Sequence, residues 1–127
     1  MVGIVLISHS RTLAEAVAEV ARAMGVGKAA VEPAGGDSEG GLGTSIDLAE
    51  DAVRRADGGD GVLLLADIGS SVLTAKMLIE DADGEEIMLA DAPLVEGAIA
   101  AASMAATGAG LPAVHAAAEA AREHRKT

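Results

Sequence analysis

Short apolar runs alternate with helix-period patterns along the whole chain. Two runs are long and continuous enough to be typical of buried strands, VGIVLI at 2–7 and GVLLLA at 61–66. Two shorter runs, 29–32 and 86–90, have the same character. We therefore expect four strands, each followed by a segment of a different pattern.

Those segments between the strands are typical of amphipathic helices. After the first strand, apolar residues repeat at helical spacing up to two glycines that stop the helix: Leu13, Val17, Val20 and Met24, then Gly25 and Gly27. The second helix is expected to start from Thr44 as its N-cap. Further helices are expected at about 72–80, after Pro93 and after Pro112. Residues 33–43 are expected to form a glycine-rich loop and 81–84 a turn.

Repeated strand–helix units predict an α/β fold. Right-handed crossovers between such units give a parallel sheet with helices on both faces, a three-layer sandwich. The 127 residues suit one core, and no linker or repeat divides them, so we expect a single domain over 1–127.

Composition narrows the classes of function. The net charge of −11 disfavours nucleic acid and anionic membrane surfaces, and the absence of aromatic residues removes stacking surfaces. The lack of Cys removes thiolate sites, and no set of residues has metal-ligand spacing, so neither a metal nor a cofactor is expected. With no signal peptide or membrane-spanning run apparent, a cytoplasmic protein without membrane insertion is expected.

Candidate chemistry lies just after the two long strands. His9 follows the first, and Asp67 follows the third, ahead of Gly69, Ser70 and Ser71 at a helix start. If these two strands are adjacent, His9 and Asp67 meet at the carboxyl edge of the sheet, where ligands bind in such folds. A carboxylate that holds one imidazole nitrogen leaves the other nucleophilic, and helix amides hold anions, which favours a phosphoryl-carrying histidine. The alternative is a loop histidine beside a capping aspartate. His115 and His124 are expected on the solvated surface, without a role.

Four segments carry a family resemblance: LISHSRTLAEAV, EPAGGDSEGGLGTSI, LLLADIGSSVLTA and APLVEGAIAAA. In this order they resemble the mannose-type IIA domains of the bacterial phosphoenolpyruvate (PEP)-dependent phosphotransferase system. Within that group, SHS, GTS, DIGSS and PLVEGA are most similar to the phosphotransferase subunit of PEP-dependent dihydroxyacetone kinase. The likeness covers nearly the whole chain.

The resemblance implies a sheet of strand order 2-1-3-4, usually in a homodimer, and a specific reaction. His9 would accept phosphate from the histidine-containing phosphocarrier protein and pass it to ADP bound in a partner subunit of dihydroxyacetone kinase. Asp67 would orient His9. The remaining site residues would contact the phosphoryl group or the partner: Ser8, Ser10, Gly43, Thr44, Gly69, Ser70 and Ser71.

Some expectations stay open. A IIA component of a mannose-type sugar transporter, with a IIB partner, is an alternative function, and so is a regulatory relative that carries no phosphate. Lys76 departs from the acidic residue more usual in the family, and the third helix is expected to be a turn shorter. The Ala-rich run at 98–106 suggests an exposed apolar patch and hence a homodimer interface.

Overall fold

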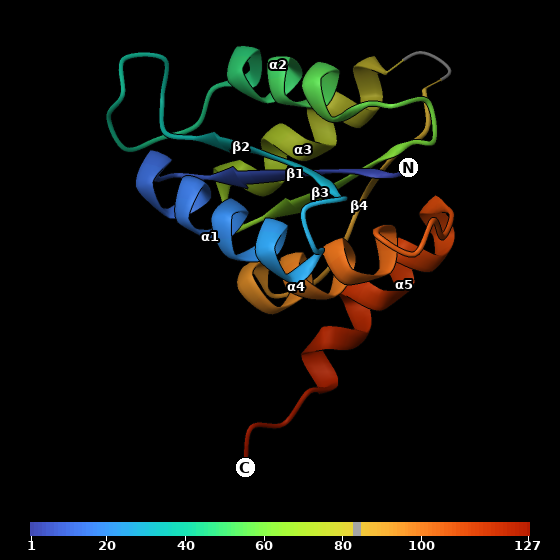
Figure 1. Cartoon of the computed structure of the whole chain (residues 1–127). Helices are drawn as coiled ribbons and strands as arrows, with labels where there is room; N and C mark the ends of the chain where they lie inside the picture. The colour runs from blue at the N-terminus through green and yellow to red at the C-terminus, as the bar shows by residue number, and fades with distance from the viewer. Residues whose placement is uncertain (83–84) are drawn as a thin grey trace.

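A four-stranded parallel sheet forms the centre of the protein. The computed structural model describes residues 1–82 and 85–127. Its strands are β1 (Gly3–Ser8), β2 (Ala30–Gly35), β3 (Val62–Ala66) and β4 (Ile87–Leu89), in the order β2-β1-β3-β4 (Figure 1). The expected α/β fold and strand order are confirmed.

Helices cover both faces of this sheet. On one face lie α1 (Arg11–Met24), α4 (Leu94–Ala105) and α5 (Leu111–Ala120), and on the other lie α2 (Ile46–Ala56) and α3 (Ser70–Asp81) (Figure 1). A short 3₁₀ helix, Ala121–Glu123, follows α5. The turn expected at 81–84 includes residues 83–84, which lie outside the described part. No helix within 1–82 and 85–127 combines the length and the hydropathy needed to span a bilayer.

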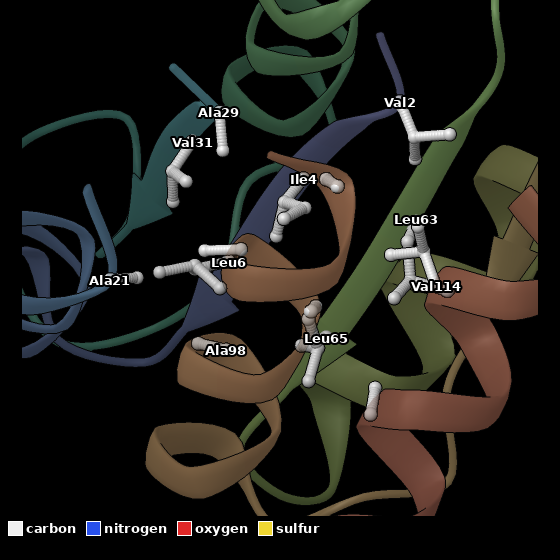
Figure 2. Close-up of a cluster of buried hydrophobic side chains, with 14 of the residues drawn as sticks. Val2, Ile4, Leu6, Ala21, Ala29, Val31, Leu63, Leu65, Ala98 and Val114 are labelled. Carbon is white, nitrogen blue, oxygen red and sulfur yellow. The ribbon is translucent and has the colours of Figure 1, made fainter. Parts of the chain in front are cut away.

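The two long strands are buried on both sides, as their continuous apolar sequences predict. Side chains of β1 alternate between the two helical layers: Ile4 and Leu6 pack into one cluster, Val5 and Ile7 into the other. Figure 2 shows the first cluster, in which aliphatic strand residues meet helix alanines such as Ala21 and Ala98. Without aromatic side chains, burial requires the helices to approach the sheet closely.

The edge strand β2 is longer than the sequence pattern suggested. It continues to Gly35 and passes through Pro33, which pairs in register with Leu6. Proline is tolerated there because an edge strand needs ladder hydrogen bonds on one side only. The glycine-rich loop therefore begins after residue 35, close to the carboxyl end of β1.

Helix α1 buries three alanines and Val17, while its other large apolar side chains are exposed. Ala14, Ala18 and Ala21 have no exposed surface and Val17 has 5%, whereas Leu13, Val20 and Met24 are 41–54% exposed. The backbones of α1 and α4 lie close together, which explains why alanines are buried here. A Cβ added to Gly25 at the end of α1 would lie 3.2 Å from the Ala102 carbonyl oxygen of α4. Only small residues fit between helices so close together.

The Ala-rich run at 98–106 is buried along one side of α4. Ala98, Ala101, Ala102 and Ala105 have no exposed surface, because α4 lies between the sheet, α1 and α5 (Figure 1). Met104 of the same run is 36% exposed, and Leu13, Val20 and Met24 are exposed on one flank of α1. The homodimer interface expected at 98–106 stays a prediction, and α1 offers the larger group of exposed apolar side chains.

Candidate active site

The two candidate residues meet because their strands are neighbours. β1 pairs with β3, with Ile7 opposite Ala66, and the amide of Asp67 donates to the Ile7 carbonyl at 3.1 Å. The two strands thus end side by side, and the residues that follow them lie at the carboxyl edge of the sheet, which forms the rim of the site. The adjacency of the first and third strands, on which the site expectation depended, is present.

His9 is held by Asp67 through both its ring and its backbone. Its Nδ1 lies 3.0 Å from Oδ1 of Asp67, and its amide donates to Oδ2 at 3.0 Å. The His9 side chain is 34% exposed and that of Asp67 17%. The ring is therefore fixed in orientation while one edge of it reaches solvent.

Asp67 accepts several further hydrogen bonds. The Ser8 hydroxyl donates to Oδ2 at 2.9 Å and the Ile68 amide to Oδ1 at 2.7 Å, and Ser71 adds a side-chain hydrogen bond. Partial burial by itself would raise the pKa of Asp67. The hydrogen bonds from Ser71, His9, Ile68 and Ser8 outweigh it and hold that pKa well below its usual range. Asp67 is thus ionised at neutral pH.

An ionised Asp67 decides the tautomer of His9. A carboxylate only accepts hydrogen bonds, so the proton of a neutral His9 resides on Nδ1. Nε2 then carries the lone pair, and the Ser70 hydroxyl donates to it at 2.8 Å. The nucleophilic nitrogen faces the rim.

Ser8, Ser10 and Ser71 lie away from this nitrogen. Ser8 and Ser71 are fully buried; Ser71 Oγ is 3.2 Å from Nδ1, and the Ser8 hydroxyl also accepts from the Ser10 amide at 3.1 Å. Ser10 is the N-cap of α1, where its hydroxyl accepts from the Leu13 amide. These serines support Asp67 and the start of α1.

The glycine-rich loop closes over the backbone of His9. The Gly43 amide donates to the His9 carbonyl at 3.0 Å, and the φ of +144° at Gly43 favours glycine. The Thr44 hydroxyl donates to Ser70 Oγ at 3.4 Å. The sequence suggested Thr44 as the N-cap of α2, and this is wrong. The N-cap is Ser45, whose hydroxyl accepts from the Leu48 amide.

The amino terminus of α3 completes the rim. Gly69 precedes the helix with a φ of +51°, a conformation that favours glycine, and a Cβ there would meet nothing within 4 Å. The first amides of a helix have no intrahelical acceptor. Gly69 and Ser70 therefore present an anion-binding surface beside Nε2.

The other histidines lie outside this arrangement. His115 was expected on the solvated surface, but only 22% of its side chain is exposed. Its Nε2 lies 3.3 Å from the Leu89 carbonyl oxygen and 3.2 Å from Oε2 of Glu119. His124 is exposed, as expected. Over the described ranges, no group of three or more His, Asp or Glu residues is arranged to hold a metal ion.

Two contributors were missed by the sequence analysis. Asp37 organises the loop, since its Oδ1 accepts from the amides of Glu39 and Gly41. An aspartate inside a glycine-rich segment is the signal that points to such a turn. The Ile68 amide has no such signal, because any residue supplies it.

Lys76 is exposed on α3 and lines a cavity of about 370 Å³ next to Asp67.

Known proteins resemble this chain over most of its length. A family model described as EIIA-man, PTS system fructose IIA component, matches residues 3–115. The chain is 37% identical over 120 residues to the phosphoryl donor subunit DhaM of PEP-dependent dihydroxyacetone kinase from Klebsiella michiganensis. That alignment covers 90% of this chain but only 25% of the relative, so the chain spans about a quarter of its length. A Listeria innocua relative, phosphoryl donor subunit DhaM of PEP-dependent dihydroxyacetone kinase 2, is 34% identical, over 80% of this chain and 84% of its own length.

Solved structures share the fold. The crystal structure of EF1359, described as a protein of unknown function, superposes with a TM-score of 0.82 at 31% identity, over 93% of this chain and 92% of that one. A sigma-54 interaction domain protein from Enterococcus faecalis superposes with a TM-score of 0.73 at 20% identity, over 96% and 90%. The second likeness concerns the fold alone.

Proposed function

The chain belongs to the EIIA-man family of PTS system fructose IIA components, and we propose that it carries a phosphoryl group on Nε2 of His9. The observation that carries the proposal is the pairing of His9 Nδ1 with Oδ1 of Asp67 at 3.0 Å. This pairing leaves Nε2 as the nucleophile, and it places a negative charge beside the ring. The ring becomes positive as the phosphorus–nitrogen bond forms, so Asp67 stabilises the transition state more than the ground state.

The rim residues have separate roles in this proposal. The amides of Gly69 and Ser70, at the start of α3, bind phosphoryl oxygens. Gly43 holds the His9 backbone, and Thr44 lies beside Ser70. Ser8 and Ser71 are positioning residues for Asp67 because both are buried and both hydrogen-bond to its carboxylate. Ser10 fixes the start of α1.

The proposed reaction links two partner proteins. The phosphoryl group arrives from the histidine-containing phosphocarrier protein and leaves for ADP held in a second subunit of dihydroxyacetone kinase. The names of the relatives from Klebsiella and Listeria, both phosphoryl donor subunits of that kinase, support this assignment. We place the reaction in the cytoplasm, where PEP is the phosphoryl source.

The protein is proposed to be a homodimer through α1. Leu13, Val20 and Met24 are exposed on one flank of the helix, and positions 16 and 23 beside them are alanines. Glu19 lies at helical spacing from both alanines and borders that flank, while the other ionisable residues of α1 lie elsewhere on the helix. Two copies of a chain with a net charge of −11 repel each other least across such a face.

Phosphorylation by purified components tests the function. The protein is incubated with PEP, enzyme I and the phosphocarrier protein, and intact mass is recorded. One acid-labile phosphoryl group is expected, and His9→Ala is expected to abolish it, while His124→Ala serves as the exposed-histidine control. Label that persists in His9→Ala contradicts the proposal. Adding the ADP-containing kinase subunit or a transporter IIB protein then identifies the acceptor; transfer to the IIB protein alone favours the sugar-transporter alternative.

A further inference from the structure

The Ser70 hydroxyl is hydrogen-bonded to the nitrogen that forms the bond to phosphorus in the proposed function. Ser70 Oγ lies 2.8 Å from Nε2 of His9. Because Nδ1 carries the ring proton, Nε2 is an acceptor, and the hydroxyl must donate to it. The unphosphorylated site therefore contains a hydrogen bond on the reacting lone pair itself.

Thr44 holds that hydroxyl in place from the opposite side. Its Oγ1 donates to Ser70 Oγ at 3.4 Å, across 26 positions of sequence. The three groups form a chain in which Thr44 donates to Ser70 and Ser70 donates to His9. Thr44 comes from the loop before α2 and Ser70 from the start of α3, so the chain also connects two segments of the rim.

A neutral imidazole has one in-plane lone pair on its unprotonated nitrogen. The hydrogen of Ser70 and an incoming phosphorus atom cannot both occupy that direction. The amides at the start of α3 lie next to the same hydroxyl, where phosphoryl oxygens would be bound. The hydroxyl therefore needs to turn only from the nitrogen to one of those oxygens.

We propose that the Ser70 hydroxyl is a two-position donor, bonded to Nε2 before transfer and to a phosphoryl oxygen after it, with Thr44 as its positioning residue. The inference rests on the proposed function, since it concerns the same nitrogen. It assigns to Ser70 a contact with the reacting atoms in both states and separates it from the buried Ser71.

The transfer step balances without any further reactant. The Nε2 lone pair forms the new bond to phosphorus as the bond from phosphorus to the donor's imidazole nitrogen breaks, and that nitrogen keeps the electron pair. His9 retains its Nδ1 proton, so its ring becomes positive opposite ionised Asp67. Ser70 retains its own proton and changes only the acceptor.

The two hydrogen bonds differ in strength, and this gives the proposal a measurable consequence. A bond to a charged phosphoryl oxygen is roughly twice as strong as one to a neutral nitrogen. Loss of the hydroxyl therefore destabilises phosphorylated His9 more than unphosphorylated His9. We expect Ser70→Ala to lower the equilibrium constant for phosphorylation by about tenfold and to shorten the lifetime of phosphohistidine.

The experiment combines a measurement without phosphate and one with it. Nitrogen-15 NMR of the unphosphorylated protein reports the hydrogen bond to Nε2, and Ser70→Ala is expected to move that resonance toward the value of an unbonded nitrogen. The phosphorylation equilibrium is then measured against the phosphocarrier protein. Thr44→Val is expected to change both quantities in the same direction but less, and Ser70→Thr to restore them. Ser103→Ala, at an exposed serine of α4, is the matched control.

The outcomes separate this inference from the proposed function. An unchanged Nε2 resonance, or an unchanged equilibrium constant in Ser70→Ala, overturns the inference, even where His9 of the wild-type protein is labelled. Absence of label on wild-type His9 overturns the proposed function instead. The resonance shift in Ser70→Ala is measured without phosphate and tests the resting hydrogen bond in either case.

Discussion

Nδ1 of His9 lies 3.0 Å from Oδ1 of Asp67, although 58 positions of sequence separate the two residues. The His9 amide bonds to the other oxygen of the same carboxylate. One aspartate thus fixes both the backbone and the ring of the histidine. Most of the testable consequences of the site follow from this relationship.

The phosphoryl group is expected on Nε2. Nδ1 is occupied by its proton and by Asp67, while Nε2 faces the rim. Nitrogen-15 NMR of the phosphorylated protein distinguishes the two ring positions. A phosphoryl group on Nδ1 would contradict the proposed role of Asp67 and reduce it to a helix cap.

Asp67→Ala is expected to slow phosphorylation of His9 by about 10²–10⁴-fold, the usual contribution of an orienting or acid–base group. The variant loses both the ring orientation and the charge that balances the positive ring. Quenched-flow transfer from the phosphocarrier protein measures the rate, and circular dichroism checks that the fold is retained. Asp47→Ala, at an exposed aspartate of α2, is expected to transfer at the wild-type rate. Equal rates for the two variants would reduce Asp67 to a structural role.

Acid stability is expected to depend on Asp67. Its folded pKa is lower than its ordinary value of 3.8, so the unfolded chain binds a proton first as pH falls. The stability that ionised Asp67 contributes is complete above that ordinary value and is lost as pH decreases below it. Urea unfolding of Asp67→Asn between about pH 5 and pH 2 should show a shallower loss than the wild type. Parallel curves for the two proteins are incompatible with this linkage.

Val20→Glu is expected to convert the proposed homodimer to a monomer, because it places a charge in the exposed apolar flank of α1. Sedimentation equilibrium at micromolar concentration gives the assembly state. Met77→Glu changes an exposed methionine on α3, across the sheet from α1, and is expected to remain dimeric. A wild-type protein that sediments only as a monomer argues against the interface.

Gly35→Ala is expected to displace the start of α1 and so disturb His9. A Cβ at Gly35 would lie 2.4 Å from the Ser10 carbonyl oxygen and 2.7 Å from the Arg11 Cα, both backbone atoms. Overpacking of this kind costs about 1–3 kcal/mol, measurable by urea unfolding together with the rate of phosphorylation. Gly58→Ala, whose Cβ would meet only the Met1 carbonyl oxygen at 3.5 Å, is expected to have little effect.

The two central strands were readable from the sequence because each is a continuous apolar run that is followed directly by polar residues. Residues 2–7 and 61–66 identify the two central strands, and His9 and Asp67 follow them directly. The parallel topology then places both residues at one edge of the sheet. Local pattern and chain connectivity determined that much.

Only the tertiary structure decided which side chains are buried and which hydroxyl faces which nitrogen. Hydrophobic spacing marks Leu13, Val20 and Met24 on α1, yet the close approach of α4 selects the alanine face. Ser70 and Ser71 are adjacent in sequence, but helical rotation sends one to Nε2 and buries the other near Nδ1. Such choices depend on contacts between distant segments, and no local periodicity encodes them.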